Sequence, residues 1–348
     1  MKKLVLAAAL SAAATTAFAG VLMALLCAAC QPQKELQFSG KTMGTSYSIT
    51  VPARHASNRL ADSIDQRLEE LEDVFSTWRD DSEISRFNAS RSTGWFSCSE
   101  ELEKVVAESI LIHDLTGGAF EVTLGPLIER WGFGKQDVTA PPSDEDMAAL
   151  MLSVGTGHLE TRRSPPAIRK RHPDTSLNLS GIAKGYAVDA VSGLLEQNGL
   201  AAYMVEIGGE VRTKDRNGDR PWRIAIARPQ PGEPGAQRIL ETRKAAIATS
   251  GSYQNSLELL DKRYIHILNP ATGQPVKSQT ASVTVIDEES TMRADALATA
   301  LMVIPAKDAL RLADEQGIAA HLILLDEQGR LVSRSSMAFD PWSTSTKP

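Results

Sequence analysis

The sequence predicts an α+β fold with mixed, largely antiparallel sheets and packed helices. Segments that alternate polar and apolar residues stand among amphipathic helical segments, without the strict alternation of strand and helix that a parallel sheet requires. The chain has 348 residues, of which 42% are apolar, so it can bury a sizeable core. We expect one continuous folded unit over residues 36–335 and a C-terminal tail at 336–348, with its last part, 343–348, disordered.

The first thirty residues have the pattern of an export signal, which takes no part in the predicted fold. Lys2 and Lys3 precede an apolar stretch that ends near Leu26. Cys27-Ala28-Ala29-Cys30 then predicts a lipoprotein signal peptide at residues 1–29, lipidation of Cys30 and a polar tether at 30–35. Two alternatives remain open: ordinary secretion after cleavage at Ala17-Phe18-Ala19, and an uncleaved N-terminal helix.

Between residues 36 and 131 the patterns predict two strands and four helices. The strands, at 36–38 and 47–51, are joined by a loop at 40–45. The helix at 56–75 places Leu60, Ile64, Leu68, Leu71 and Phe75 on one apolar stripe. Shorter helices are expected at 82–87, where Ser82 is the cap, at 99–115 and at 124–131.

From residue 132 onward the expected order begins with a loop at 132–144, a polar segment that contains Pro165 and Pro166, and a strand end at 177–179. A helix at 182–198, a strand at 201–207 and a turn at Gly208-Gly209 follow. The remaining elements are strands at 222–227, 246–249, 264–267, 282–286 and 319–325, and helices at 291–303 and 306–315.

The stretch from Leu177 to Tyr186 is the strongest candidate for a binding site. A short apolar run feeds through Ser180-Gly181 into a helix whose first turn carries Lys184. Glycine allows a ligand to approach the backbone, and the free N–H groups and dipole at a helix start favour an anion. The pattern therefore indicates a phosphate or carboxylate site, although its spacing is neither that of a P-loop nor that of G-x-G-x-x-G.

Asp295 and Thr299 are four residues apart on a predicted helix, so their side chains lie on one face. A carboxylate and a hydroxyl on one face supply hard oxygens, which suit magnesium, or they form only a local hydrogen bond. The histidines show no metal-ligand spacing such as H-E-x-x-H. The net charge of −6 and the lack of a long basic run argue against a nucleic-acid partner.

Seven collinear segments, spread over about residues 36–335, carry a resemblance to a known family. The first is the stretch from Leu177 to Tyr186 described above. The others are Gly40-Lys41-Thr42-Met43-Gly44-Thr45, Phe75-Ser76-Thr77-Trp78 with the following 82–88, Thr116-Gly117-Gly118-Ala119-Phe120-Glu121-Val122-Thr123, Glu206-Ile207-Gly208-Gly209-Glu210, His266-Ile267-Leu268-Asn269-Pro270-Ala271-Thr272-Gly273 and Ala294-Asp295-Ala296-Leu297-Ala298-Thr299. Together these segments resemble the ApbE family of FAD:protein FMN transferases.

The resemblance implies an ApbE-like fold and magnesium-dependent transfer of FMN from FAD to a threonine, or sometimes a serine, with release of AMP. The acceptor is then a flavoprotein subunit of a membrane redox complex. The implied magnesium ligands are Asp295, Thr299 and the carbonyl of Gly181. The residues implied to hold FAD are Met43, Trp78, Ala119, Phe120, Glu121, Asn178, Lys184 and His266.

His266 is either the group that assists proton removal from the acceptor or one that orients the phosphate, and a structural histidine is the alternative. Glu121 and Asn178 stand where many family members carry aspartate. The expected location is the periplasmic side of the inner membrane through a lipid anchor, with the outer membrane as the alternative. Three other functions stay open: FAD hydrolysis to FMN and AMP, non-catalytic flavin binding, and solute binding.

Overall fold

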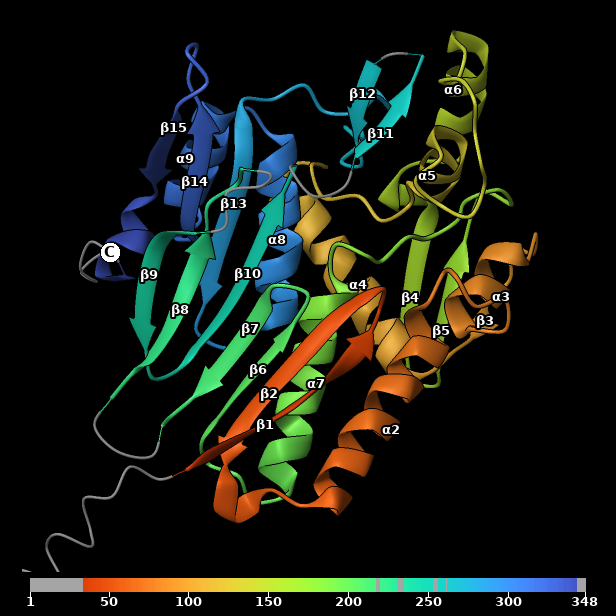
Figure 1. The fold of residues 1–348 in the computed structure, drawn as a ribbon. Coiled ribbons are helices and arrows are strands. Elements are labelled where there is room, and N and C mark those ends of the chain that lie inside the picture. The colour runs from red at the N-terminus through yellow and green to blue at the C-terminus, as the bar shows by residue number, and fades with distance from the viewer. Residues whose placement is uncertain (1–33, 217–219, 231–234, 253–255, 261, 343–348) are drawn as a thin grey trace, which may run out of the picture.

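The computed structural model describes residues 34–216, 220–230, 235–252, 256–260 and 262–342. They form the predicted α+β fold, built on an eight-stranded antiparallel sheet (Figure 1). In order across this sheet, the strands are β1 (Glu35–Thr42), β2 (Thr45–Pro52), β6 (Tyr203–Ile207), β7 (Glu210–Lys214), β10 (Ala245–Gly251), β13 (Thr280–Asp287), β14 (Ala319–Leu325) and β15 (Leu331–Ser335).

Smaller sheets and the helices surround this sheet. The small sheets are β3 (Phe96–Ser97) with β5 (Pro166–Lys170) and β4 (Leu159–Arg163), β8 (Trp222–Ala227) with β9 (Ala236–Thr242), and β11 (Ser256–Leu259) with β12 (Lys262–Ile265). The helices are α2 (Asn58–Phe75), α3 (Glu83–Ala89), α4 (Glu100–Leu115), α5 (Gly125–Trp131), α6 (Asp144–Met151), α7 (Ala183–Gln197), α8 (Thr291–Val303) and α9 (Ala306–Glu315). Short 3-10 turns are η1 (Ala53–His55), η2 (Thr156–His158) and η3 (Met337–Trp342).

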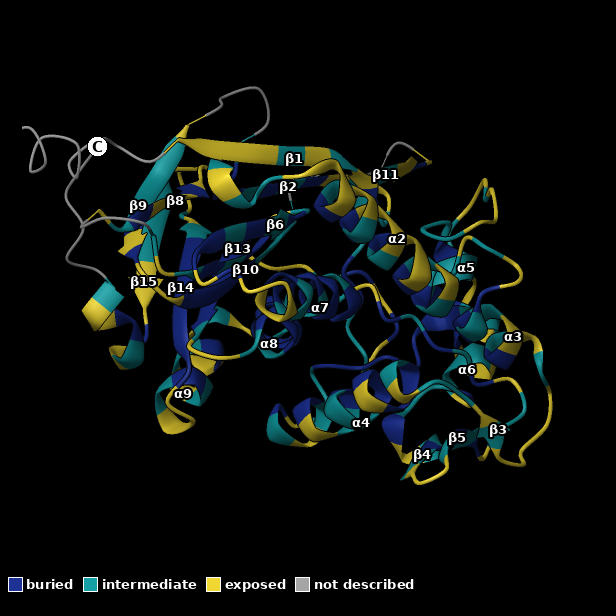
Figure 2. Ribbon diagram, turned by 90° about the horizontal axis from the view of Figure 1, so that it is seen from below, coloured by how far each residue is buried: buried dark blue, intermediate teal, exposed yellow. Residues whose placement is uncertain are grey.

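Different elements pack against the two faces of the large sheet. Alternation along β10 and β13 turns Ala248 and Val285 toward α7 and α8, and turns Ile247 and Ile286 toward the β8–β9 hairpin and η3. Figure 2 shows buried segments of the sheet and of both helices in the middle of the molecule, where α8 contacts β10, β13 and α7. The helix side forms the main core, and the residues proposed to bind magnesium lie where α7 and α8 meet.

The predicted helices are confirmed, and serine caps set four of their starts. Ser57, Ser82, Ser99 and Ser290 each accept a backbone N–H three residues ahead, at the beginning of α2, α3, α4 and α8. The helices expected at 291–303 and 306–315 have those bounds in the structure. Capping and apolar periodicity, both local signals, were sufficient for these elements.

Three predicted segments differ from the structure. The loop expected at 40–45 shrinks to a two-residue turn, because Met43 and Gly44 both adopt positive φ and let β1 pair with β2 up to Thr42. The strand end expected at 177–179 is wrong: the backbone there belongs to no strand, and only the neighbouring Ser176 bridges to Leu124. The strand expected at 264–267 begins earlier and ends at Ile265.

Several elements were not predicted. Helix α6 starts inside the expected 132–144 loop, with a capping box formed by Ser143 and Asp146. The polar segment around Pro165 is the β4–β5 hairpin, and β3, β7, β9, β11 and β15 are also additional strands. Past residue 335, η3 packs Phe339 into the core beneath β8 and β9, so part of the expected tail is folded.

Residues 1–33, which include the expected signal peptide and Cys30, lie outside the described residues, as does the end of the tail at 343–348. Within the ranges that the structure describes, no helix is both long and apolar enough to cross a bilayer.

Candidate active site

The segment before α7 is held by hydrogen bonds to the side chain of Asn88 rather than by pairing with a neighbouring strand. The amide of Asn88, in the last turn of α3, donates to the carbonyl of Leu177 at 2.8 Å and accepts its N–H at 2.7 Å. The next N–H, that of Asn178, donates to the carbonyl of Val122 at 2.8 Å. These bonds replace the missing strand partners and fix the approach to the turn before α7.

Asn178 and Gly181 shape that turn. The Oδ1 atom of Asn178 accepts the N–H of Ser180 at 3.0 Å and its hydroxyl at 2.6 Å. A Cβ at Gly181 would stand 3.0 Å from Oγ1 of Thr299, so glycine lets the turn approach α8 closely. The carbonyl of Gly181 is 3.4 Å from this hydroxyl, and Oγ of Ser250 is 3.2 Å from it. Three oxygens therefore meet at Thr299.

The first turn of α7 packs directly on α8. A Cβ at Gly185 would lie 2.4 Å from the carbonyl oxygen of Thr291, which leaves no room for a side chain. Asp295, one turn further along α8, is 1% exposed, and its Oδ2 atom accepts the N–H of Gly185 at 2.9 Å. A buried carboxylate thus satisfies an N–H group at the start of α7, where the helix dipole favours negative charge.

Lys184 lies between two buried carboxylates. Its Nζ atom is 3.8 Å from Oδ2 of Asp295 and 3.4 Å from Oε1 of Glu210, and it donates to the carbonyl of Ser180 at 3.1 Å. Glu210 is 2% exposed, and its Oε2 atom has no hydrogen-bond partner in the described part of the chain. The central cluster is the set Gly181, Lys184, Glu210, Asp295 and Thr299.

The central cluster is short of positive charge. Burial raises the pKa of Glu210 to about 8, with Asp295 adding to the rise and Lys184 opposing it. Burial also raises the pKa of Asp295, against the effect of Lys184 and of the Gly185 N–H. Burial by itself would lower the pKa of Lys184, but the two carboxylates outweigh it and the pKa is raised. Two carboxyl groups share one ammonium group, and either a proton on Glu210 or a further cation would offset the second carboxylate.

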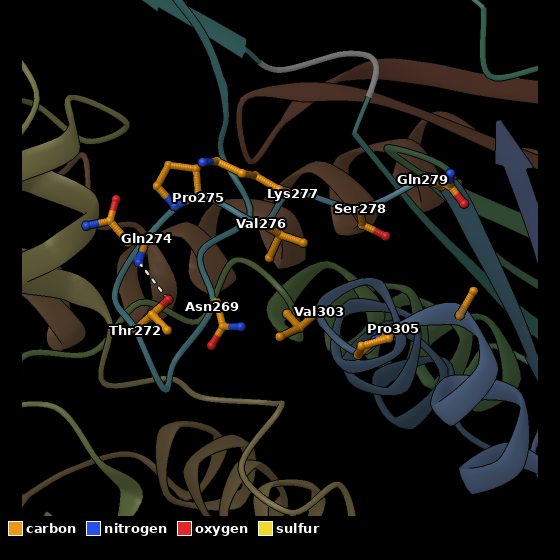
Figure 3. A pocket seen from close by; sticks show the side chains of 11 residues that line it. Asn269, Thr272, Gln274, Pro275, Val276, Lys277, Ser278, Gln279, Val303 and Pro305 are labelled. Carbon is orange, nitrogen blue, oxygen red and sulfur yellow. Dashed lines mark hydrogen bonds between the residues drawn. The ribbon is translucent and has the colours of Figure 1, made fainter. Parts of the chain in front are cut away.

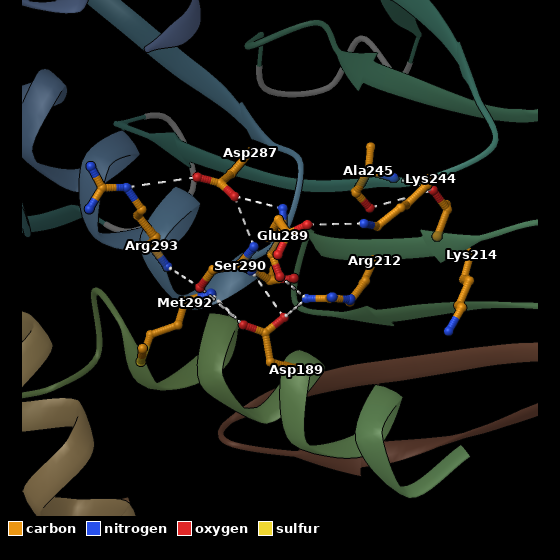
Figure 4. A network of polar contacts seen from close by, with 12 residues as sticks. Asp189, Arg212, Lys214, Lys244, Ala245, Asp287, Glu289, Ser290, Met292 and Arg293 are labelled. Carbon is orange, nitrogen blue, oxygen red and sulfur yellow. Dashed lines mark hydrogen bonds and ion pairs between the residues drawn. The ribbon is translucent and has the colours of Figure 1, made fainter. Parts of the chain in front are cut away.

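A second carboxylate joins the two helices one turn away from the cluster. Asp189, on α7, accepts the N–H groups of Thr291 at 3.0 Å and Met292 at 3.1 Å, the first two residues of α8 (Figure 4). Arg212 of β7 donates to Asp189 at 2.6 Å. Asp189 therefore caps the start of α8 while Asp295 binds the start of α7, and the reciprocal contacts hold the helices in register.

Asp189→Asn is expected to lower the free energy of unfolding by about 1–3 kcal/mol, because it leaves Arg212 without its charged partner and weakens the cap. Chemical denaturation measures the change. Asp62→Asn, at an exposed position on α2, is the control and is expected to stay within about 0.5 kcal/mol of the wild type. If both variants unfold at the denaturant concentration of the wild type, the contact between the helices does not stabilise the fold.

Met43 and Trp78 lie on turns at other elements. Met43 occupies the β1–β2 turn with a φ of 49°, and its N–H donates to the carboxylate of Glu72. Trp78 follows α2 and is 66% exposed, which is unusual for so large an apolar side chain. An exposed indole is free to stack on a flat ring system, so its position suits the predicted contact with FAD.

The side chains of Phe120 and Glu121, two of the residues predicted to hold FAD, point into the protein. Phe120 is buried in the main core. The carboxylate of Glu121 accepts the N–H and hydroxyl groups of Thr123 and Thr156 at 2.7–2.9 Å. Oε1 accepts three of these bonds and Oε2 accepts one, and Oε2 also lies 3.2 Å from Nδ1 of His113, so the carboxylate is held inside the protein. Ala119 and the main chain are then the parts of this stretch that can face a ligand.

His266 is the first residue after β12 rather than part of a strand. Its neighbours Ile265 and Ile267 both pack against the main core, while His266 itself is half-buried. The structure thus holds His266 on a different segment from the central cluster, and its role in the reaction stays a prediction.

The oxygens of the central cluster fit a hard divalent cation. The Gly181 carbonyl and the Thr299 hydroxyl are 3.4 Å apart, and Asp295 lies one turn before Thr299 on α8. The partnerless oxygen of Glu210 points the same way. No group of three or more His, Cys, Asp or Glu side chains in the described ranges could hold a metal. Main-chain, ligand and water oxygens would have to complete the shell, as magnesium allows.

Sequence reasoning missed Glu210 and Asp189. Glu210 belongs to one of the segments that carry the family resemblance, but nothing local shows that it pairs with Lys184, 26 residues earlier in the chain. A carboxylate directly after a glycine turn was the one available signal. Asp189 resembles any polar position on a helix until the start of α8 is placed beside it.

Comparisons with known proteins agree with this geometry. A family model described as the ApbE family matches residues 43–322. The curated FAD:protein FMN transferase of Vibrio cholerae serotype O1 is 41% identical over 326 residues, which cover 91% of this chain and 96% of the relative. The FAD:protein FMN transferase of Escherichia coli (strain K12) is 36% identical over 290 residues, 82% of each chain.

Solved structures show the same similarity. The flavin transferase ApbE from Vibrio cholerae superimposes with a TM-score of 0.81 at 40% identity, over 89% of this chain and 100% of that one. The apo form of the Pseudomonas stutzeri flavinyl transferase ApbE also gives a TM-score of 0.81, at 35% identity, over 91% of this chain and 99% of that one.

Proposed function

Because the chain belongs to the ApbE family, we propose that it is an FAD:protein FMN transferase, which moves the FMN half of FAD onto a threonine or serine hydroxyl of an acceptor protein and releases AMP. The names of the relatives support flavin transfer to protein. The observation that carries the proposal is the buried central cluster of two carboxyl groups, one ammonium group and neutral oxygens at the start of α7, assembled from segments that carry the family resemblance.

In the proposed reaction the acceptor oxygen forms a bond to the phosphorus of the FMN half. The bond from that phosphorus to the AMP oxygen breaks, and AMP leaves with its electron pair. The acceptor hydroxyl loses its proton. Either His266 accepts this proton directly, or the proton passes to solvent and His266 orients the phosphate. Transfer of this kind depends mainly on positioning and on neutralising charge.

The carbonyl of Gly181, the carboxylate of Asp295 and the hydroxyl of Thr299 would hold magnesium, which when bound offsets the negative charge of the diphosphate. Lys184 brings an ammonium group to the same end of α7, where N–H groups and the helix dipole favour phosphate. Glu210 keeps Lys184 in place from the other side. The proposed FAD contacts are Met43, Trp78, Asn178, His266, and Ala119 with the main chain of 120–121.

The test is AMP release from FAD with magnesium, measured with and without an acceptor. A transferase releases AMP in step with covalently bound flavin, whereas a hydrolase releases it equally well without the acceptor. A flavin-binding or solute-binding lipoprotein releases none. Transfer is favoured over these alternatives by the names of both curated relatives and of both solved structures.

We place the protein, by the same proposal, on the periplasmic side of the inner membrane, held by lipid on Cys30 and acting on a flavoprotein subunit of a membrane redox complex. The support is the charged start, the apolar run and the small residues before Cys30. Two or more acyl chains make such an attachment stable, whereas one alone is marginal.

Cys30→Ser is therefore expected to leave the protein soluble or unprocessed, with AMP release unchanged, because the site lies in the folded unit beyond the tether. Membrane fractionation and intact mass of the N-terminus measure this. A wild-type protein whose unmodified N-terminus is Gly20 would contradict lipidation and support ordinary secretion.

A further inference from the structure

A cavity of about 540 Å³ lies between the loop that follows β12 and the corner that joins α8 to α9 (Figure 3). The loop contributes the amide side chains of Asn269, Gln274 and Gln279 to its wall. The corner contributes Val303 and Pro305. The volume is within the range of small-ligand sites, and the lining mixes polar and apolar groups.

One wall of the cavity continues the face of α8 that carries the proposed magnesium ligands. Asp295, Thr299 and Val303 are spaced four residues apart, so they share a face, each about 6 Å beyond the last along the helix. Val303 lines the cavity, and the hydroxyl of Thr299, one turn earlier, is 3.4 Å from the Gly181 carbonyl. The cavity thus lies about one helical turn from the central cluster.

The opposite wall is the continuation of the segment that carries His266. The chain passes from His266 through the buried Ile267 and reaches the lining at Asn269. The N–H of Val276, which lines the cavity, donates to the carbonyl of Ile267 at 2.9 Å. The cavity is therefore bounded by the His266 segment on one side and by the helix of the central cluster on the other.

The lining suits a polypeptide. Of its eleven described residues, Lys277 is the one with a formal charge. The amide side chains can each donate and accept hydrogen bonds, as a peptide backbone requires. Lys277 and Ser278 are exposed and lie in no helix or strand, and within the described chain their backbone N–H and C=O groups bond to no other residue. A peptide chain can pair with this free stretch of backbone.

We propose that this cavity binds the segment of the acceptor protein that carries the reacting hydroxyl, an inference that rests on the proposed function. An in-line transfer requires the attacking oxygen to approach the phosphorus opposite the departing AMP oxygen. Apart from His266, the proposed FAD contacts come from the β1–β2 turn, the loops after α2 and α4, and the start of α7, and the described lining includes none of these elements. The acceptor enters from the side that the FAD contacts leave open. The positive charge of Lys277 favours an uncharged or acidic acceptor segment over a basic one.

Gln274→Trp and Gln279→Trp fill the cavity from exposed positions, and Gln316→Trp, exposed at the end of α9, is the matched control outside it. Each full-length protein receives FAD, magnesium and a titrated membrane fraction from cells that lack the gene. Covalent flavin fluorescence on denaturing gels gives the half-saturating concentrations of membrane protein and of FAD. Both cavity variants are expected to raise the half-saturating concentration of membrane protein at least about tenfold, the equivalent of 1.4 kcal/mol. They are expected to leave the half-saturating concentration of FAD unchanged.

If both half-saturating concentrations are unchanged in the cavity variants, the assignment is overturned. It is also overturned if the half-saturating concentration of FAD rises, because the cavity would then be part of the FAD site. A loss of labelling in the Gln316→Trp control equal to that in the cavity variants would also count against it. If the wild-type protein labels no acceptor at all, the proposed function fails, and this inference falls with it. Circular dichroism of each variant separates these outcomes from misfolding.

Discussion

Asp295→Ala is expected to abolish magnesium-dependent AMP release at ordinary magnesium concentrations. Asp295 carries the one formal negative charge among the three proposed ligands, and changes even in groups that only support a metal ligand typically cost about 10–100-fold in affinity. We therefore expect the magnesium concentration for half-maximal AMP release to rise at least about 100-fold. The substitution also leaves the N–H of Gly185 and the ammonium of Lys184 without this carboxylate, so some loss of stability will accompany it.

Asp295→Asn separates charge from shape, since the amide keeps an oxygen for the Gly185 N–H and for the metal. It is expected to weaken magnesium binding less than alanine does, and high magnesium should restore part of the activity. Asp308→Asn, an exposed carboxylate on the neighbouring α9, is the control. If the magnesium midpoint for AMP release is the same in all these proteins, Asp295 is not a metal ligand.

His266→Ala is expected to slow flavin transfer by about 10²–10⁴-fold at saturating FAD and acceptor, the usual cost of losing a general base. His266→Gln distinguishes the two proposed roles. Glutamine still donates a hydrogen bond to a phosphate but takes up no proton, so it restores much of the rate only if His266 orients the phosphate. The measurement is the turnover number from covalent flavin fluorescence.

His172→Ala is the control for this series, because His172 lies beside His158 near the β4–β5 hairpin, away from β12. It should leave turnover unchanged. If His266→Ala also has a normal turnover number, His266 has only a structural role.

The helices followed from local signals, while many strands did not. Helix α2 combines a serine cap with an unbroken apolar stripe, and the structure contains both features as predicted. The β4–β5 hairpin carries arginine where an alternating strand would show small or apolar residues. Arg162 and Arg169 of these strands instead lie against the ring of Trp95, at 4.8 and 4.7 Å from its centre. Such a pairing depends on partners distant in sequence, so no local pattern predicts it.

The proposed binding turn illustrates the same limit at the site. Its residues were identified from glycine spacing and from family resemblance, but the expected strand before it was wrong, because Asn88 supplies the bonds that a neighbouring strand would have given. Lys184 was predicted, whereas its buried partner Glu210 was not. The direction of a side chain is also a tertiary property, and Glu121 turns inward to Thr123 and Thr156.

The most direct test of the proposed activity is the intact mass of an acceptor subunit, purified from membranes of cells that lack the gene and incubated with this protein, FAD and magnesium. The proposed reaction predicts an increase equal to FMN less one water, located on a threonine or serine, with one AMP released for each modified acceptor. Asp295→Ala should give neither product. AMP release with no change in acceptor mass would contradict transfer and show that the protein hydrolyses FAD.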